Sequence, residues 1–346
     1  MNYSNFAPFI TFGNSCASPF EIEQRTSSGS RLNVYINNFI IILTFIMLNM
    51  AIRKMLTKQL FSKTTRNLLF YCMFYYVLHD IYFAYTMNWS FYRSIAESED
   101  SCRIMFHGSE CFFLYLIGVF LRVLLLYSQC AVTVERLVIT FFPNSDLINS
   151  VTLNIMTLII SVITTSTIRP HSHSQFNSPN CFQQIFPGMK TIRTLIWIMV
   201  AFNMFCFPVN TMIMLRNRRK FKNLQDREYN LKSRYNNKSN MYASMAVSFL
   251  SFVQSSIYTF YIFALFLTLK FFTTEDGLFY GNNLILWFYS FPLAGLALPC
   301  SILLSYCGLN LKKRNKIGIF KITTQDSYFK SLTNQWMSTS RTSIAH

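Results

Sequence analysis

The stretch from Cys111 to Arg136 constrains most strongly what this chain can fold into. It reads CFFLYLIGVFLRVLLLYSQCAVTVER, and Arg122 is the only charged residue before the closing pair Glu135-Arg136. Because an α-helix rises ~1.5 Å per residue, residues 112–134 would extend about 34 Å as a helix, slightly more than the ~30 Å hydrocarbon core of a bilayer. The stretch therefore predicts a membrane-spanning helix.

The composition indicates a membrane protein rather than a soluble domain. Of the 346 residues, 52% are hydrophobic and only 13% are charged, about half the charged share of an average soluble protein. The net charge of +17 does not indicate a nucleic-acid partner, because that function needs a basic face on a soluble fold. Here the lysines and arginines lie between apolar segments, which is a signal of membrane topology.

Seven apolar segments predict an all-α membrane protein, a seven-helix bundle in one domain. The expected spans cover about residues 32–52, 67–87, 112–134, 151–168, 192–215, 241–269 and 283–306, with tails at 1–31 and 307–346. The segments after spans one, three, five and seven hold 22 of the 31 lysines and arginines, whereas the N-terminal tail and the other three loops hold 8. By the positive-inside rule, we expect the N-terminus outside the cell and the C-terminus in the cytoplasm.

Four cysteines fall on the side expected to face outward: Cys16, Cys102, Cys111 and Cys181. Cys111 lies at the outer mouth of span three, and Cys181 lies in the next outer loop. Because the outer face is oxidising, we expect a disulfide between these two, which would hold that loop over the bundle. Cys16 and Cys102 then make a second pair, although four cysteines allow three pairings and one of them can be free.

The pair Glu135-Arg136 at the inner end of span three has two interpretations. It can be an interfacial pair whose arginine reaches the lipid headgroups. It can also be a latch that is closed at rest and releases Arg136 toward a G protein, and its position 25 residues after a loop-bridging cysteine favours this. A basic cluster after span five is expected to contribute to the same coupling: Arg216, Arg218, Arg219 and Lys220.

Short motifs are spread over the first 140 residues. They are Cys16-Ala17-Ser18 before span one, Leu78-His79 in span two, the loop cysteines Cys102 and Cys111, and Ser128-Gln129 leading to Glu135-Arg136. With these motifs the chain resembles nematode serpentine receptors of class alpha, and its C-terminal half is similar to them mainly in layout. The resemblance implies a G-protein-coupled chemosensory receptor in the plasma membrane of sensory neurons. The implied partners are a heterotrimeric G protein, a small molecule or odorant, and the lipid bilayer.

Asp80 and Arg122 are the two charged residues deep inside apolar spans. Charges at bilayer depth are costly and usually mark a partner or a functional site. Counted along the two helices, they differ in depth by roughly 6 Å, and spans two and three are joined by an outer loop. We therefore expect an Asp80–Arg122 ion pair at the floor of an outward-opening ligand cavity. The alternatives are that Asp80 binds a cation while Arg122 binds the ligand, or that Arg122 faces lipid.

Two glycosylation sequons are expected to face outward, at Asn2 and at Asn88, and Asn2 is the better acceptor because Asn88 lies close to the membrane. The chain has no nucleophile–base constellation, phosphate-binding loop or HExxH motif, so we expect neither an enzyme nor a bound cofactor or metal. Two other functions stay open: a receptor of the same fold for an internal peptide or transmitter, and a channel or transporter.

Overall fold

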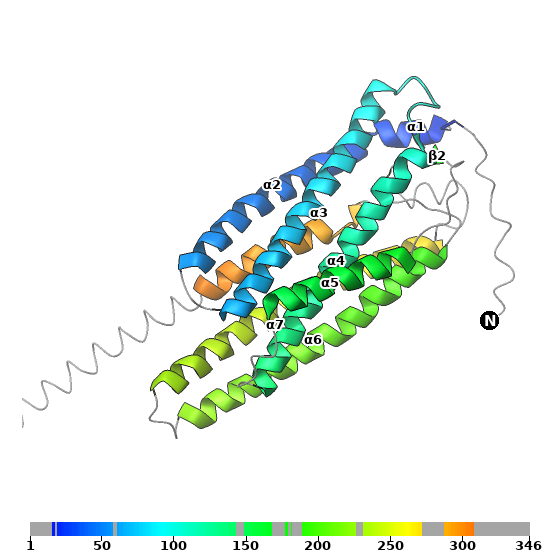
Figure 1. Ribbon diagram of the computed structural model, residues 1–346. Coiled ribbons are helices and arrows are strands. Elements are labelled where there is room, and N and C mark those ends of the chain that lie inside the picture. The colour runs from blue at the N-terminus through cyan, green and yellow to red at the C-terminus, as the bar shows by residue number, and fades with distance from the viewer. Residues whose placement is uncertain are drawn as a thin grey trace, which may run out of the picture. The chain divides into compact units, whose positions relative to one another are not determined.

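The computed structural model describes residues 16–17, 19–57, 61–142, 149–167, 177–178, 181, 189–225, 231–271 and 287–307. These ranges are mostly helical (Figure 1): α1 (Pro19–Thr26), α2 (Ser28–Thr57), α3 (Lys63–Ala96), α4 (Gly108–Phe141), α5 (Ser150–Thr167), α6 (Met189–Gln225), α7 (Leu231–Phe271) and a last helix, Phe291–Cys307. The two-residue strands β1 (Phe106–His107) and β2 (Asn177–Ser178) pair antiparallel. The chain divides into two compact units, Met1–Ile302 and Leu303–His346. In the second unit, residues 303–307 are helical.

Helix α4 is the central element of the first unit. It contacts α3, α5, α6 and α7, and Figure 1 shows it running through the middle of these helices. Of its apolar window, 61% is buried within the protein, compared with 28% for α2 and 22% for α5. The apolar stretch that begins at Cys111 is therefore the helix around which the others pack.

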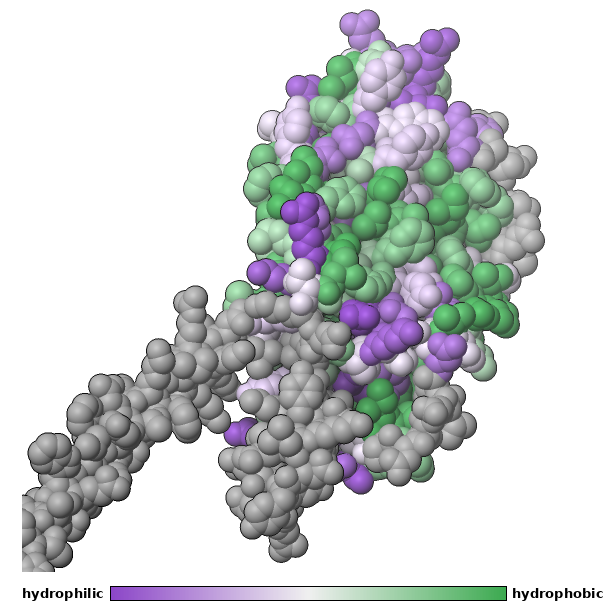
Figure 2. Space-filling view, turned by 60° about the vertical axis from the view of Figure 1, so that its left-hand side comes forward, coloured by the Kyte–Doolittle hydropathy of each residue, from purple (hydrophilic) through white to green (hydrophobic). Residues whose placement is uncertain are grey.

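The surface of the helices is strongly apolar. In the part of the chain that the structure describes, four helices are long and apolar enough to cross a membrane: Ser28–Thr57, Glu110–Phe141, Ser150–Thr167 and Met241–Ala264. On the face shown in Figure 2, hydrophobic side chains gather in a band between more hydrophilic zones. Such a band would be unstable in water, and it is what a lipid bilayer would cover.

Helix α5 presents two different faces, because side chains four positions apart lie on one side of a helix. Ile155, Ile159 and Ile163 form an exposed stripe, and Thr157, Ser161 and Thr165 form a buried one. Each buried hydroxyl donates to the carbonyl oxygen one turn earlier, at 2.7–2.8 Å. Its polarity is thus satisfied within the helix, and these small side chains allow close packing against neighbouring helices.

Where the structure describes the expected spans, their residues are helical except at 288–290. Helix α3 has 34 residues and α6 has 37, so both are longer than the spans expected within them. In the last expected span, Trp287 is helical, residues 288–290 are not, and a helix runs from Phe291 to Cys307, while residues 283–286 lie outside the described ranges. The helix start at Phe291 has a physical reason, because Pro292 lacks a backbone N–H and suits the first turn of a helix. Where the membrane surface crosses each helix stays a prediction.

The expected N-terminal tail is partly folded. Helix α1 lies within it, and α2 begins at Ser28, four residues before the expected span. Ala17 donates its backbone N–H to the Ser101 carbonyl at 2.7 Å and is buried against Ile104 and Met105. The N-terminal segment is therefore fastened to the α3–α4 loop, which hydropathy alone did not indicate.

Candidate functional site

One end of the bundle carries two disulfides, and we call it the capped end. Cys111 is bonded to Cys181, and Cys16 is bonded to Cys102, which are the pairings favoured from the sequence. Cys111 and Cys181 are buried together with Phe106 of β1. The disulfide and the β1–β2 pairing thus fix the same loop to the start of α4.

Two arginines that the sequence analysis did not single out stabilise the capped end. Arg25 of α1 donates a hydrogen bond to the Ile104 carbonyl oxygen. Arg93 of α3 forms a 2.9 Å ion pair with Glu110 at the start of α4. Both guanidinium groups lie over the Phe106 ring, at 5.5 and 4.3 Å from its centre. Cation–π contacts of this kind add to the disulfides in holding α1, α3 and β1 together.

At the other end of α4, Glu135 and Arg136 form an ion pair. Arg136 Nε lies 2.9 Å from Glu135 Oε2, and the two side chains are only 1% and 0% exposed. Adjacent residues on a helix do not normally face each other, so both side chains must bend toward the same neighbour. Removing either partner would leave an uncompensated buried charge, which is strongly destabilising.

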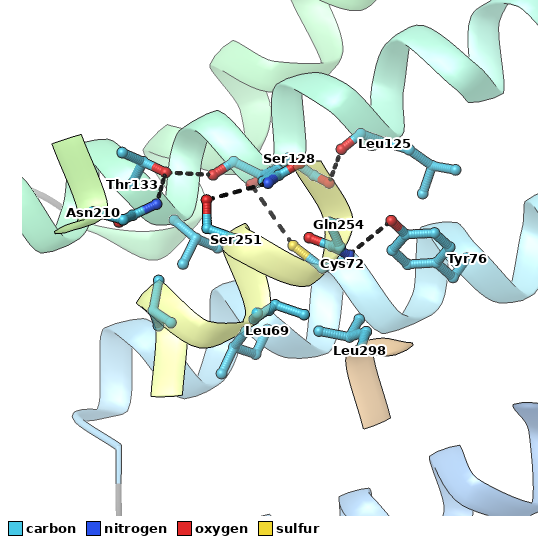
Figure 3. Close-up of a pocket in the computed structure, with 14 residues that line it drawn as sticks. Leu69, Cys72, Tyr76, Leu125, Ser128, Thr133, Asn210, Ser251, Gln254 and Leu298 are labelled. Carbon is cyan, nitrogen blue, oxygen red and sulfur yellow. Dashed lines mark hydrogen bonds between the residues drawn. The ribbon is translucent and has the colours of Figure 1, made fainter. Parts of the chain in front are cut away.

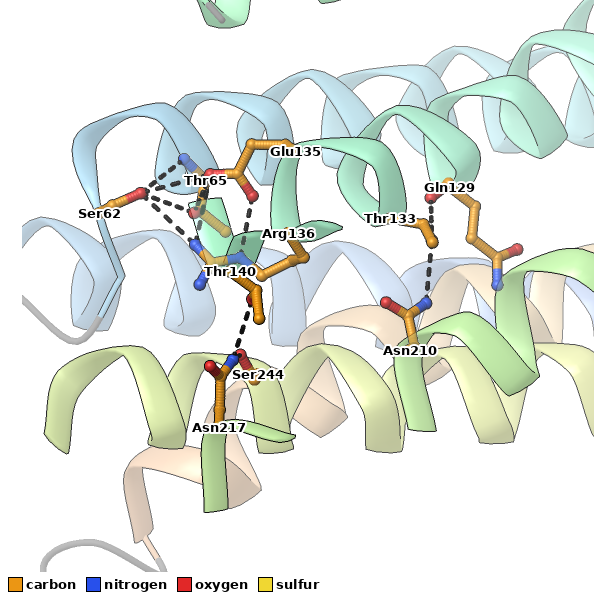
Figure 4. A network of polar contacts seen from close by, with 10 residues as sticks. All are labelled: Ser62, Thr65, Gln129, Thr133, Glu135, Arg136, Thr140, Asn210, Asn217 and Ser244. Atoms are coloured by element: carbon orange, nitrogen blue, oxygen red, sulfur yellow. Dashed lines mark hydrogen bonds and ion pairs between the residues drawn. The ribbon is translucent and has the colours of Figure 1, made fainter. Parts of the chain in front are cut away.

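That neighbour is the start of α3 (Figure 4). Ser62 is the N-cap of α3, and its Oγ accepts from the Thr65 backbone N–H at 3.2 Å. Thr65 Oγ1 donates to Glu135 Oε1 at 2.6 Å, and Ser62 Oγ donates to the same oxygen at 3.4 Å. Because a helix N-terminus carries a partial positive charge, it attracts the carboxylate. We call Ser62, Thr65, Glu135 and Arg136 the latch cluster.

Amide side chains on α6 join this helix to α4 and α7 (Figure 4). Asn210 Nδ2 donates to Thr133 Oγ1 of α4 at 2.9 Å. Asn217 Nδ2 lies 3.1 Å from Thr140 Oγ1 of α4 and 2.7 Å from Ser244 Oγ of α7. Helices α4, α6 and α7 are therefore tied together by side chains at the end that holds the latch cluster.

The basic cluster lies on α6 at this same end, and its members are all exposed: Arg216, Arg218, Arg219 and Lys220. The Arg216 guanidinium carbon lies 4.0 Å from the centre of the Phe141 ring, at the end of α4. This cation–π contact places the first residue of the basic cluster against the helix that carries the latch.

The expected ion pair between Asp80 and Arg122 is wrong for this structure, in which both residues are described and buried. Asp80 Oδ1 instead lies 3.3 Å from His79 Nδ1. Its Oδ2 is directed toward the last helix, where a Cβ at Gly295 would lie 3.4 Å from it. Counting residues along a helix gives a depth but no direction around the axis, so it could not show that α3 turns Asp80 away from α4.

An aromatic cluster surrounds His79 between α3 and the segment that leads into the last helix. His79 Nε2 lies 2.6 Å from the Tyr289 hydroxyl, and the imidazole packs against Phe83 and Phe291, at 6.2 and 5.6 Å between ring centres. The Arg122 guanidinium carbon lies 5.7 Å from the centre of the Tyr289 ring. Aromatic faces, an imidazole and a guanidinium are groups that can recognise a small ligand with both apolar and polar parts.

A small cavity lies between α3, α4, α6, α7 and the last helix (Figure 3). Half of its lining is polar: Tyr76, Ser128, Gln129, Thr133, Asn210, Ser251 and Gln254. Gln254 Nε2 donates to the Tyr76 hydroxyl at 2.9 Å, and Gln129 Nε2 donates to Ser251 Oγ at 3.5 Å. The cavity volume of about 20 Å³ suits one or two water molecules. An odorant does not fit there.

The structure describes only one of the two asparagines expected to carry a glycan. Asn88 lies inside α3, where its Nδ2 donates to the Ala84 carbonyl at 2.7 Å and its amide exchanges hydrogen bonds with Asn38 of α2 at 3.0 and 3.1 Å. Glycan acceptors lie in surface loops, so this geometry does not fit a glycan on Asn88. Asn2 lies outside the described residues.

Comparison with known proteins gives the identity of this bundle. Residues 12–336 match the family described as serpentine type 7TM GPCR chemoreceptor Sra. The chain belongs to the Sra family. It is 27% identical to serpentine receptor class alpha-32 of Caenorhabditis elegans over 90% of this chain and 93% of that protein. It is also 25% identical to class alpha-10 of C. elegans, over 95% of this chain and 99% of that protein.

Membership of the Sra family makes the chain an all-helical, multi-pass membrane protein of the seven-transmembrane receptor type, and not an enzyme. Within this receptor, the sequence drew attention to Glu135 and Arg136 but not to Ser62 and Thr65. A local signal was present, because a serine three residues before a threonine at the start of an apolar run is the spacing of an N-cap and its N3 partner. No sequence pattern indicated the tertiary contact between the N-cap of α3 and α4.

Proposed function

We propose that this Sra protein is a chemosensory receptor in the plasma membrane of sensory neurons, which binds an extracellular small molecule or odorant and activates a heterotrimeric G protein. The observation that carries the proposal is the buried Glu135–Arg136 pair held by the start of α3. A charged pair on α4 that is hydrogen-bonded to the start of α3 gives the bundle a closed resting arrangement. Opening it would free a positive charge at the end of α4 for a partner protein.

The proposed orientation has the capped end outside the cell and the latch cluster at the cytoplasmic side. Two disulfides at one end support this, because disulfides persist in oxidising compartments. The basic cluster at the opposite end supports it as well, because lysines and arginines are retained on the cytoplasmic side of a membrane. The exposed side chains of Arg218, Arg219 and Lys220 are then available to a G protein and to anionic lipid.

The ligand is proposed to bind next to the aromatic cluster, with Arg122 and Asp80 as the nearby charges. The rings of Tyr289 and Phe291 offer apolar faces, and Arg122 offers a positive charge beside them. A ligand that displaced the Tyr289 hydroxyl from His79 would loosen a 2.6 Å contact between α3 and the segment before the last helix. This is a route by which binding could alter the packing of α3, the helix that holds the latch.

The test is a ligand screen in cells that express the receptor with a reporter of G-protein activation. Once a ligand is found, Arg136→Ala is expected to abolish the ligand-driven signal of the receptors that reach the surface. The signal is normalised to surface level, because the unpaired, buried Glu135 carboxylate lowers stability. Arg53→Ala is the matched control, because Arg53 is an exposed arginine near the end of α2. Normal activation by the Arg136→Ala receptor would refute the latch.

A further inference from the structure

Two free cysteines on different helices lie in direct contact. Cys130 Sγ of α4 and Cys206 Sγ of α6 are 3.0 Å apart, about one ångström more than the ~2.05 Å of a disulfide bond. The chain has five free cysteines, and the other three differ in this respect. Cys72, for example, is buried with its Sγ directed at the Ser128 carbonyl oxygen.

A small polar cavity lies one helical turn from the pair. Cys206 is 2% exposed, and Cys130 is partly exposed. One turn further along the same helices, the Asn210–Thr133 hydrogen bond begins the wall of the water-sized cavity, and Gln129, directly before Cys130, lines it too. Hydrogen peroxide is a small polar molecule with the same hydrogen-bonding groups as water. The two cysteines do not line the cavity, but residues one helical turn from them do, so a peroxide held there would lie close to the pair.

We propose that Cys130 and Cys206 are a redox-active dithiol, which a peroxide converts into a disulfide between α4 and α6. In the first step the thiolate formed from Cys130 attacks one peroxide oxygen and the O–O bond breaks. The departing hydroxide takes up the proton that Cys130 gave up and leaves as water, and Cys130 becomes a sulfenic acid. In the second step the thiolate formed from Cys206 attacks the sulfenic sulfur, the S–S bond forms and the S–O bond breaks. The departing hydroxide takes up the Cys206 proton and leaves as a second water. One peroxide is reduced to two waters while two thiols are oxidised to one disulfide.

With the proposed orientation of the receptor, the thiols of Cys130 and Cys206 are reduced at rest. Cys130 precedes Arg136 by six residues, about 9 Å along the helix, so the dithiol lies in the cytoplasmic half of the bundle. The cytoplasm keeps thiols reduced, which distinguishes this pair from the two disulfides of the capped end. A transient rise in peroxide concentration is then the signal that oxidises the dithiol to the disulfide.

The disulfide would stabilise the arrangement in which the two sulfur atoms already meet. In that arrangement the latch cluster is closed and α6 is bonded to α4 through Asn210 and Asn217. A covalent link between α4 and α6 therefore opposes any opening that separates these helices. This consequence rests on the proposed G-protein function, whereas the formation of the disulfide does not.

The first experiment measures the chemistry alone. Membranes that contain the full-length receptor are treated with hydrogen peroxide, alkylated, and digested without reduction for mass spectrometry. We expect the receptor to lose two of its five free thiols and to yield one cross-linked peptide that joins Cys130 to Cys206. Cys130→Ser and Cys206→Ser should each abolish the cross-link, and Cys72→Ser should leave it unchanged. Oxidation that stops at a sulfinic acid on one cysteine, or a folded receptor without the cross-link, would overturn the proposal.

The second experiment measures the consequence. In cells that respond to a ligand, peroxide is expected to lower the ligand-driven G-protein signal of the wild type and to leave the signal of the Cys206→Ser receptor unchanged. Equal loss in both receptors would assign the effect to other targets of peroxide and overturn the locking role. A wild-type receptor that is cross-linked and still signals fully would do the same. Failure of the G-protein function itself would appear earlier, as absence of signal without any peroxide.

Discussion

Removing one hydroxyl from the latch cluster should make the receptor active without ligand. Thr65→Val keeps the size and branching of the side chain but deletes the Oγ1 that donates to Glu135 at 2.6 Å. A hydrogen bond to a charged group contributes ~1.5–3 kcal/mol, and about 2 kcal/mol changes an equilibrium constant roughly 30-fold. If about 1% of the receptor is active at rest, the variant would be roughly 20% active. Basal nucleotide exchange on the G protein, normalised to surface level, measures this directly.

A matched threonine separates the latch from the general effect of a lost hydroxyl. Thr44 of α2 is fully buried, but its Oγ1 donates only to the Ile40 carbonyl of its own helix, at 2.9 Å. Thr44→Val should therefore leave basal exchange at the wild-type level. If Thr65→Val also remains at that level while reaching the surface normally, the carboxylate does not hold the resting state through Thr65, and the reasoning fails.

Two further predictions concern stability. Cys111→Ser or Cys181→Ser should sharply reduce surface delivery, since losing a native disulfide costs ~2–5 kcal/mol. Cys300→Ser is the control, because it alters a free thiol. An equal loss of surface delivery in Cys300→Ser would mean that the disulfide is not the cause of the loss. Gly118→Ala would put a Cβ 2.5 Å from the Tyr82 hydroxyl, so the purified receptor should be destabilised by ~1–3 kcal/mol of overpacking. Its melting temperature should recover when Tyr82→Leu is added, and a variant that melts like the wild type would contradict the α3–α4 contact.

The fold was accessible from the sequence because bilayer-length apolar runs leave few alternatives. The run after Cys111 predicted a membrane-spanning helix, and this run forms α4. Its position at the centre of the bundle was not predicted. The elements whose stability comes from tertiary contacts were harder to predict from the sequence. Helix α1 has eight residues, too few to be stable alone, and it is held by the Cys16–Cys102 disulfide and by Arg25.

The site was accessible only where its residues are adjacent in the chain. Glu135 and Arg136 form a recognisable pair, but Thr65 lies 70 residues away from Glu135, and its N-cap spacing with Ser62 does not indicate a contact with α4. Asp80 also shows what the sequence could and could not predict. Its burial was expected from its position in an apolar span, whereas its partner depends on the rotation of α3 about its axis, which a hydropathy pattern does not determine.

One face of α4 connects the functional regions of the molecule. At 3.6 residues per turn each residue advances ~100°, so Cys111, Arg122, Gln129 and Arg136 lie within about 20° of a common line along the helix. That line runs from the disulfide at the capped end, past the guanidinium beside Tyr289 and the wall of the water-sized cavity, to the latch. Because a packed helix moves as a rigid body more readily than it bends, a small rotation of α4 forced at Arg122 would displace Gln129 and Arg136 in the same direction. The proposed ligand site and the latch cluster can therefore be coupled by one helix, without a chain of separate side-chain rearrangements.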